Sequence, residues 1–354
     1  NEFNENIISF PNCSREDKFF LEMTNDYVVL MSSTQIRKAK AYFSQYKIDP
    51  TIVVGVYHPF EASIQFSFKA RNLLPFLGYR GVNYYQYLYP LTRKKVLSFL
   101  KKGMSSNGLY FMDKACYRAT SYFLNLDVEH KKDVNFIPVP FSNKVNIETK
   151  KSKKQGLSFG YIGRVEDFKT IPLINFISDL NKLNLEHINL YVIGDGKDLK
   201  IIKKLVEVKY KKINTIFLGA LPNSESLNMM QECVDIAACM GTAALDTSSL
   251  GLPTILLNPV EKNIAQYRYN WLHLSEGFVL GDYADAPWYV EKGKKLEELV
   301  QEAKLDYVGI SLKAINYVKE NHSLKTVCQS IINLANSSSF KLSDVPFRKL
   351  REIN

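Results

Sequence analysis

Apolar and polar positions at residues 234–258 predict a strand, a tight turn, a helix and a second strand. The apolar run 234–239 has the length of a buried strand, and small residues follow it. After about two helical turns, Gly251 stands where a helix ends in the left-handed conformation, and Pro253 prevents its continuation. Residues 254–257 (Thr-Ile-Leu-Leu) are expected to form a second buried strand. The stretch therefore predicts one βαβ unit.

The same alternation runs through the rest of the chain and predicts an α/β protein with parallel sheets and crossover helices on both faces. Further strands are expected at 6–10, 27–31, 51–57, 81–89, 134–139, 157–162, 187–193 and 215–218. Helices are expected at 35–46, 61–74, 92–102, 109–125, 200–208, 223–233, 294–303, 312–318 and 323–334. Because 354 residues are too many for one compact core, we expect two domains.

A lysine-rich segment at residues 143–155 interrupts the alternation and contains few apolar residues. A charge run of this kind is typical of a solvated linker, so we place the boundary between a first domain at 1–142 and a second at 143–336. The C-terminal tail, residues 337–354, begins with serines and is basic. It either packs back on the first domain, which we expect, or is disordered.

The composition is that of a packed globular protein, with 46% hydrophobic and 12% aromatic residues. The five cysteines are scattered and lack the spacing of a metal site, which favours buried thiols in a reducing compartment. No apolar stretch reaches the roughly 18–20 residues that span a bilayer, and no signal peptide is visible. We therefore expect a cytoplasmic protein without a metal.

The net charge of +10 is compatible with nucleic acid, an anionic membrane surface or anionic small substrates as partners. No nucleic-acid-binding motif is present, and the aromatic residues are not interleaved with arginine, so nucleic acid is not expected. The segment 92–102 combines five basic residues with apolar residues at helical spacing. It is either a helix that lies on an anionic membrane or a helix with an ordinary solvated face.

Glycines and cations follow several predicted strands of the second half. Gly163 and Arg164 come after one strand, and Lys169 stands five residues after Arg164. A planar guanidinium and a lysine point charge both bind phosphate oxygens, so this pair suits a diphosphate; the alternative is a surface turn. Gly194 and Gly219 end the next two strands. The recurrence at successive strand ends favours a phosphate site.

The helix after residue 241 offers unpaired amides and a positive dipole end at its start, which suits a phosphate. Gly241 allows a ligand to approach the backbone closely, and Thr242 is expected to cap the helix. Asp246 lies one turn further on, roughly on the face of Thr242. Its carboxylate either accepts hydrogen bonds from ribose hydroxyls or complements the helix dipole.

In order and separation these pieces resemble the donor-binding domain of the GT-B-fold, nucleotide-sugar-dependent glycosyltransferases, in particular the large retaining family 4. The resemblance covers about residues 157–258 and rests on Gly163-Arg164 with Lys169, Ile193-Gly194-Asp195-Gly196, Phe217-Leu218-Gly219, and Asp246 with Gly251-Leu252-Pro253. It implies two Rossmann-like domains that face a cleft. The first would bind the acceptor and the second a nucleoside-diphosphate sugar, which is a co-substrate that needs no cofactor or metal.

The resemblance implies that Arg164 and Lys169 hold the donor diphosphate during catalysis and that Asp246 binds the nucleotide ribose. His58 resembles the histidine that often follows an early strand in this family, and it is the third catalytic candidate; a single histidine is otherwise a structural or exposed residue. The other donor-binding residues implied are Gly163, Gly194, Gly219, Ala220, Met240, Gly241, Thr242 and Ala243.

The chain departs from the family pattern at one acidic position. Family members commonly carry two glutamates eight positions apart; here the second is the shorter Asp246, and the first would fall at Ala238. The alternative to an active enzyme is therefore a degenerate sugar-nucleotide-binding scaffold subunit. A nucleotide-sugar epimerase of the same fold fits less well, because residues 239–242 differ from the Asp-Ser-Gly-Gly run expected there.

The resemblance also implies a role in the assembly of bacterial surface polysaccharide, with a glycan or a lipid-linked glycan as acceptor. Together with the basic segment 92–102, a lipid-linked acceptor would bring the protein to the inner face of the cell membrane, in peripheral contact with anionic lipid.

Overall fold

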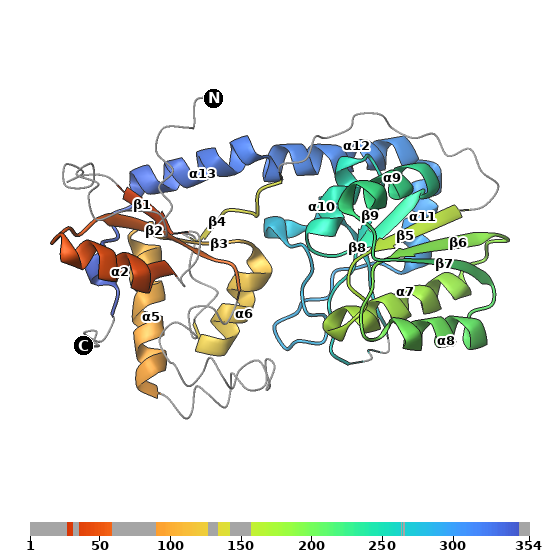
Figure 1. Ribbon diagram of the computed structural model, residues 1–354, viewed down its shortest axis with the longest axis horizontal. Coiled ribbons are helices and arrows are strands. Elements are labelled where there is room, and N and C mark those ends of the chain that lie inside the picture. The colour runs from red at the N-terminus through yellow and green to blue at the C-terminus, as the bar shows by residue number, and fades with distance from the viewer. Residues whose placement is uncertain are drawn as a thin grey trace. The chain divides into compact units, whose positions relative to one another are not determined.

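The computed structural model describes residues 27–30, 35–58, 90–126, 134–141, 157–262, 264 and 266–346. The strands predicted at 6–10 and 81–89 and the helix predicted at 61–74 lie outside these residues. The chain divides into two compact units, the first formed by residues 1–138 and 328–354 and the second by residues 139–327 (Figure 1). Each unit has its own sheet and its own core.

The sheet of the first unit is parallel, in the order β1-β2-β3-β4. Its strands are β1 Tyr27–Leu30, β2 Thr51–Val56, β3 Leu109–Phe111 and β4 Asn135–Phe136, and its helices include α2 Ile36–Gln45, α5 Pro90–Ser105 and α6 Lys114–Leu124. The β-branched residues of β2 favour a strand. Ile52, Val54 and Val56 share one face of it, where they pack in a core cluster with Phe43 of α2 and Phe99 of α5.

Helix α5 contains the basic amphipathic segment that the sequence places at 92–102. Its apolar residues Val96, Phe99 and Leu100 are buried in the core of the first unit, whereas Lys101 is exposed. The helix therefore uses this apolar face to pack within its own unit. Of the two interpretations of the segment, the structure favours the helix with an ordinary solvated face.

The prediction of one helix over residues 109–125 is wrong at its start. Leu109–Phe111 forms β3, and α6 begins at Lys114, after Asp113, whose carboxylate accepts a hydrogen bond from the Cys116 amide at 2.6 Å. An aspartate in this position satisfies one of the amides that a helix leaves unpaired at its start. Three strand residues are too few to show the strand period, so the helical pattern that follows concealed them.

The C-terminal segment 338–345 contributes to the core of the first unit. The Ile52 amide donates to the Phe340 carbonyl at 2.7 Å, and Ser338 Oγ donates to the Ile52 carbonyl at 3.1 Å. The Phe340 ring is fully buried, and its centroid lies 5.9 Å from that of Phe99. Strand β2 and this late segment therefore share one core.

The sheet of the second unit has the order β10-β9-β8-β5-β6-β7, with every neighbouring pair parallel except β10 and β9. The strands are β5 Leu157–Ile162, β6 Ile188–Ile193, β7 Ile213–Gly219, β8 Ile236–Cys239, β9 Thr254–Leu256 and β10 Asn270–Trp271. The helices are α7 Thr170–Lys182, α8 Leu199–Lys209, α9 Asn223–Cys233, α10 Thr242–Ser249, α11 Leu296–Leu305 and α12 Tyr307–Tyr317; α13, Leu324–Ser337, continues into the first unit. Within the described part of the chain, no helix is long and apolar enough to cross a membrane.

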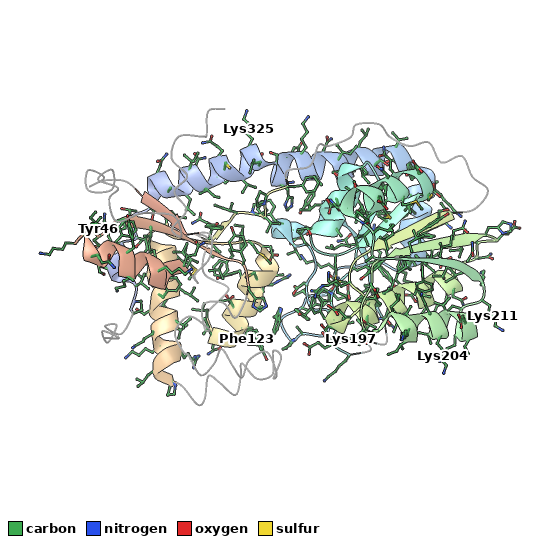
Figure 2. The ribbon with its side chains drawn as sticks, in the orientation of Figure 1. Tyr46, Phe123, Lys197, Lys204, Lys211 and Lys325 are labelled. Atoms are coloured by element: carbon green, nitrogen blue, oxygen red, sulfur yellow. The ribbon has the colours of Figure 1, made fainter. Side chains whose placement is uncertain are left out.

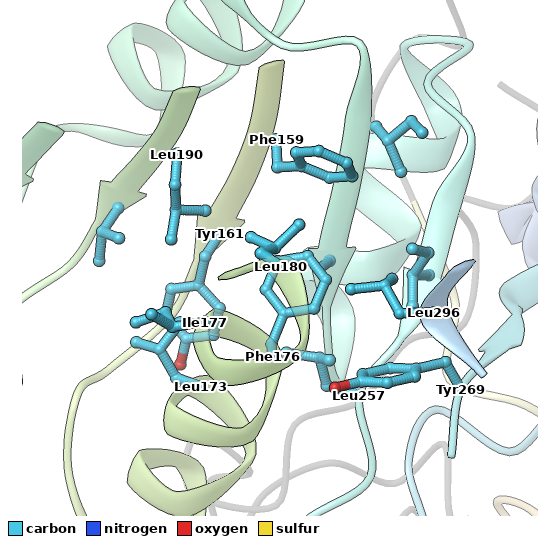
Figure 3. Packing of buried hydrophobic residues seen from close by; sticks show 14 of the residues in the cluster. Phe159, Tyr161, Leu173, Phe176, Ile177, Leu180, Leu190, Leu257, Tyr269 and Leu296 are labelled. Carbon is cyan, nitrogen blue, oxygen red and sulfur yellow. The ribbon is translucent and has the colours of Figure 1, made fainter. Parts of the chain in front are cut away.

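Alternate residues of these strands point to opposite faces of the sheet, and helices cover both faces. Phe159 and Tyr161 of β5 pack in one cluster with Phe176 of α7 (Figure 3). Gly160, between them, faces the other side, where an added Cβ would lie 2.6 Å from the end of Met230 on α9. The chain is therefore an α/β protein with parallel sheets and helices on both faces, as the sequence predicts.

Candidate functional site

The carboxyl ends of β5, β6, β7 and β8 meet at one edge of the parallel sheet in the second unit. Most predicted site residues lie there: Gly163, Arg164 and Lys169 after β5, Gly194 after β6, Gly219 and Ala220 at the end of β7, and Met240, Gly241, Thr242, Ala243 and Asp246 after β8. Open parallel sheets bind ligands outside the carboxyl ends of their strands, so this edge is the candidate site. His58 instead follows β2 in the first unit, where it is exposed.

Backbone hydrogen bonds hold the loops after β5, β6 and β7 together. The Gly163 amide donates to the Ile193 carbonyl at 3.0 Å, and the Gly194 amide donates to the Gly219 carbonyl at 2.7 Å. A Cβ added at Gly194 would lie 1.9 Å from the Gly163 carbonyl oxygen, closer than any real contact. Gly194 is therefore needed because the two loops approach each other at the backbone.

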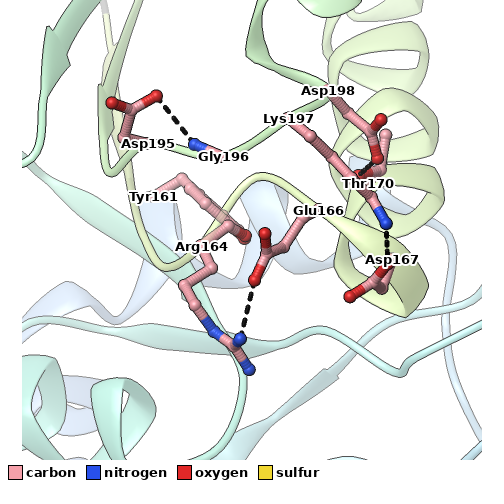
Figure 4. A network of polar contacts seen from close by, with 9 residues as sticks. All are labelled: Tyr161, Arg164, Glu166, Asp167, Thr170, Asp195, Gly196, Lys197 and Asp198. Carbon is pink, nitrogen blue, oxygen red and sulfur yellow. Dashed lines mark hydrogen bonds and ion pairs between the residues drawn. The ribbon is translucent and has the colours of Figure 1, made fainter.

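Arg164 combines a fixed backbone with an exposed side chain. Its carbonyl accepts a hydrogen bond from the Tyr161 hydroxyl at 2.9 Å, which ties the loop to the buried end of β5. The guanidinium is 67% exposed and forms an ion pair with Glu166, with 2.6 Å between Nη1 and Oε1 (Figure 4). The guanidinium is therefore accessible to a ligand, and an anionic ligand would compete with Glu166 for it.

Lys169 is the more enclosed of the two predicted cations. It ends the short 3-10 helix Asp167–Lys169, directly before α7, and it is half-buried. Burial lowers the pKa of its ammonium, the positive charge of Arg164 lowers it further, and Cys239 and Glu166 act in the opposite direction. The Val260 amide donates to the carbonyl of Phe168 at 3.4 Å, so Lys169 lies next to the segment that follows β9. Two cations that raise each other's electrostatic energy at one strand edge are suited to an anion with more than one charge.

A further cation at this edge escaped the sequence analysis. Lys197, one residue after Gly196, pairs with Asp167, and this hydrogen bond raises the pKa of the lysine (Figure 4). Next to this pair, Thr170 Oγ1 donates to Asp198 Oδ2 at 2.7 Å and so connects the starts of α7 and α8. The signal was present in the sequence, because Lys197 follows a glycine at a strand end, as Arg164 does.

Only two residues, Met240 and Gly241, separate β8 from α10. Gly241 has φ 63° and ψ −147° and occupies the N-cap position, so the expectation that Thr242 caps the helix is wrong; Thr242 is instead its first residue. The Gly241 amide donates to the Leu280 carbonyl at 2.7 Å. An added Cβ at Gly241 would meet nothing within 4 Å, so this side of the turn is open. The amides of Thr242 and Ala243 begin the helix, where the helix supplies no carbonyl partner.

Cys239 is the last residue of β8, at the candidate edge, and is buried. Burial raises the pKa of its thiol to about 12; Asp246 also raises it, and Lys169 lowers it. Asp246 is half-buried in the second turn of α10. Asp246 follows β8 and Lys169 follows the neighbouring parallel strand β5, so both lie at the same sheet edge, whereas Met240 contributes only its backbone, because its side chain is buried in the core.

The position of the first family glutamate is buried inside the sheet. Ala238 pairs with Ile255 of β9, and its side chain is fully buried in the core cluster that faces α7. β8 continues for one residue to Cys239, and the Met240–Gly241 turn then leads into α10, so this position lies within the strand and carries no carboxylate.

The segment that follows β9 packs beside this edge. Asn258 is its centre: its Oδ1 accepts a hydrogen bond from the Asp282 amide at 3.1 Å, and its Nδ2 donates to the Tyr289 hydroxyl at 3.1 Å. These contacts position the loop whose Leu280 carbonyl holds Gly241. The ring of Tyr283 also lies 5.9 Å from that of Phe168, beside Lys169.

A hollow of about 560 Å³ lies at the opposite edge of the same sheet, by the amino ends of β6 and β7. His187, Lys212 and Asn214 are among the residues that line it. Ligands of parallel sheets bind at the carboxyl ends of strands, so we assign the candidate site to the edge with Arg164 and Lys169.

No known protein-family profile and no curated protein sequence matches the chain. Among solved structures, the apo form of the lipopolysaccharide outer core galactosyltransferase WaaB covers 90% of this chain and 77% of its own, at 11% identity and a TM-score of 0.52. HepE from Anabaena, in complex with UDP and glucose, covers 88% of this chain and 78% of its own, at 10% identity and a TM-score of 0.48. A variant of TarM from S. aureus, with fondaparinux, alpha-GlcNAc-glycerol and UDP, covers 68% of this chain, at 16% identity and a TM-score of 0.43; this chain spans 46% of the TarM chain.

The likeness to WaaB agrees with the two units built on parallel sheets with helices on both faces. This chain has the GT-B fold. At this level of identity the likeness concerns the fold, and the chemistry of the site follows from its own residues.

Proposed function

We propose that the protein is a glycosyltransferase that moves a sugar from a nucleoside-diphosphate sugar to an acceptor hydroxyl. The observation that carries the proposal is the convergence of Arg164, Lys169 and the start of α10 at one strand edge. The GT-B fold supports it, as does the description of WaaB as a galactosyltransferase.

The chemistry of such a site is electrostatic. When the bond between the sugar and the diphosphate breaks, negative charge develops on the leaving diphosphate and positive charge on the sugar. Arg164 and Lys169 stabilise the diphosphate, together with the Thr242 and Ala243 amides at the positive end of α10. Asp246 accepts hydrogen bonds from the ribose hydroxyls. Since these groups supply the positive charge, the proposed reaction uses neither a metal nor another cofactor.

The finer parts of the proposal come from the family resemblance. The enzyme belongs to family 4 and retains the configuration of the transferred sugar. The first unit binds a glycan or lipid-linked glycan acceptor, and His58 is its catalytic residue. The protein acts in surface-polysaccharide assembly at the inner face of the cell membrane, in contact with anionic lipid; the WaaB description, a lipopolysaccharide enzyme, supports this pathway.

Thermal unfolding with a panel of nucleoside diphosphates and their sugars tests the donor site. A ligand that binds only the folded state adds about 2.7 kcal/mol of stability at a concentration 100 times its Kd. We expect one nucleotide to raise the Tm of the wild type but not of Arg164→Ala or Lys169→Ala. Lys182→Ala is the matched control, because Lys182 ends the same helix that Lys169 precedes, and it should respond like the wild type. If no nucleotide shifts the wild type, the proposal fails.

The buried position of Ala238 favours a second candidate, a scaffold subunit that binds a sugar nucleotide without transferring the sugar. Release of sugar from the nucleotide found in the unfolding assay distinguishes the two. Slow hydrolysis that disappears in Lys169→Ala identifies an enzyme. Tight nucleotide binding without any turnover, in the presence of a range of glycan acceptors, identifies the scaffold.

A further inference from the structure

Helix α8 presents an apolar stripe to the solvent. Ile201 and Val208 are 60% and 64% exposed, and Leu205 between them is half-buried. Their spacing of four and then three residues places all three on one face of the helix. Large aliphatic side chains aligned in this way on an outer face form a continuous apolar line about two turns long.

The stripe has no role in the packing of the helix on its own sheet. Leu199, Ile202 and Val206 perform that role, and all three are buried in the core of the second unit. Lys203 turns toward the sheet as well, with its ammonium 5.5 Å from the centre of the Phe217 ring. The outward apolar residues are therefore additional to those that fold the unit.

Lysines border the stripe. Residues 197–212 contain seven lysines and two acidic residues. Of these lysines, Lys200, Lys204, Lys209 and Lys211 are exposed, and no ion pair within the described residues involves them. Figure 2 shows Lys204 and Lys211 directed outward from this side of the unit. The face is thus apolar along its centre and strongly positive along its margins.

We propose that the outward face of α8 binds anionic lipid bilayers. Ile201, Leu205 and Val208 enter the boundary between headgroups and acyl chains, while the bordering lysines lie over lipid phosphates. The positive charge fits an anionic surface, and the central apolar stripe favours a bilayer over a soluble polyanion, which offers no apolar phase. Helix α5, the basic helix of the first unit, lacks an equivalent stripe because Val96, Phe99 and Leu100 are in the core.

The position of α8 gives this contact a consequence for the site. The helix begins at Leu199, just after the Gly194–Lys197 loop, so its first turn lies beside the edge that carries Arg164. A bilayer bound along α8 would therefore lie close to the strand edge where the donor binds. The inference specifies the surface for the membrane contact proposed above, and it does not depend on transferase chemistry.

Co-sedimentation of the full chain with vesicles tests the proposal. Vesicles of phosphatidylcholine alone are compared with vesicles of equal parts phosphatidylcholine and phosphatidylglycerol. We expect binding to the anionic vesicles only. Replacing Ile201 and Val208 together with serine should weaken it on the order of tenfold, because two partly inserted aliphatic side chains are lost. Lys200→Gln with Lys204→Gln should weaken it to a similar degree, and added salt should weaken it further.

Leu305→Ser is the matched control, because Leu305 is 87% exposed on α11 in the same unit and lies outside the stripe. All substitutions are at exposed positions, and thermal unfolding without vesicles checks that each variant folds. The proposal is overturned if the wild type does not bind anionic vesicles, or if the serine variant binds as well as Leu305→Ser. If the wild type binds anionic vesicles but binds no nucleotide, only the proposed function is refuted.

Discussion

Replacing Gly194 by alanine tests whether the close approach of two loops builds the candidate site. The new Cβ would lie 1.9 Å from the Gly163 carbonyl oxygen, and the residue has φ +143°, which an alanine rarely adopts. Gly219 offers a matched comparison, because it also has a positive φ, of +70°, but its Cβ would meet nothing within 4 Å. The two glycines are also hydrogen-bonded to each other.

The two substitutions differ in cost because only one of them forces atoms apart. At Gly219 the penalty is that of the backbone conformation, about 1–2 kcal/mol. At Gly194 the backbone penalty of about 1–3 kcal/mol is joined by the displacement of the Gly163 loop, which breaks one or two hydrogen bonds worth about 1 kcal/mol each. We therefore expect a loss of about 4 kcal/mol for Gly194→Ala. At roughly 3 °C per kcal/mol, the Tm should fall by about 12 °C, against about 4 °C for Gly219→Ala.

Differential scanning calorimetry measures both losses, and the transition of the second unit is the one to compare. Nucleotide binding to Gly194→Ala should also weaken, because the loop that moves carries Arg164. Equal Tm losses for the two variants would refute the reasoning, since the backbone contact would then carry no energy of its own. A Gly194→Ala protein as stable as the wild type would do so even more directly.

Three further predictions concern charges and a thiol at the same edge. Glu166→Gln frees Arg164 from its ion pair and should tighten nucleotide binding by up to about fivefold, because exposed ion pairs contribute about 0.2–1 kcal/mol. Calorimetric titration measures this change. Unchanged affinity would mean that Glu166 does not compete with the ligand. Burial lowers the pKa of the Lys169 ammonium, and a bound diphosphate raises it. Nucleotide affinity should therefore fall as the pH rises through the pKa that Lys169 has in the unliganded protein, whereas the Lys169→Arg variant should keep its affinity there. An equal fall in both proteins would contradict this prediction. With its pKa raised to about 12, buried Cys239 should resist iodoacetamide in the folded protein at neutral pH while half-buried Cys328 reacts, and early modification of Cys239 in peptide mass spectra would argue against its burial.

The second unit was more predictable than the first because its local sequence marks where strands and helices end. The strand ends near Ile162, Ile193 and Cys239 are confirmed, and in each case a glycine follows the apolar run within two residues. Gly251 has φ +77°, as predicted for the end of a helix. Local sequence determines these features, so one sequence suffices to find them.

Features that depend on distant contacts could not be found in this way. Gly241 takes the cap position from Thr242 because the Leu280 carbonyl, far along the chain, holds its amide. The partner of Lys197 lies in a loop thirty residues earlier, at Asp167. The role of Asn258 is likewise visible only once residues 282 and 289 fold back onto it. Each case depends on which loops meet at the edge, and sequence spacing carries no such information.

The contribution of Phe340 to the core of the first unit affects how the chain folds during synthesis. The second unit is continuous in sequence, whereas the first needs residues that follow Pro138 by about 200 positions. At roughly 5–20 residues per second, a ribosome needs about 10–40 s to add them. During that interval β2 lacks the Phe340 carbonyl that pairs with its Ile52 amide, and part of its apolar face lacks its final covering. The unit that begins first is therefore completed last, and it is the part of the newly made chain most dependent on protection from aggregation.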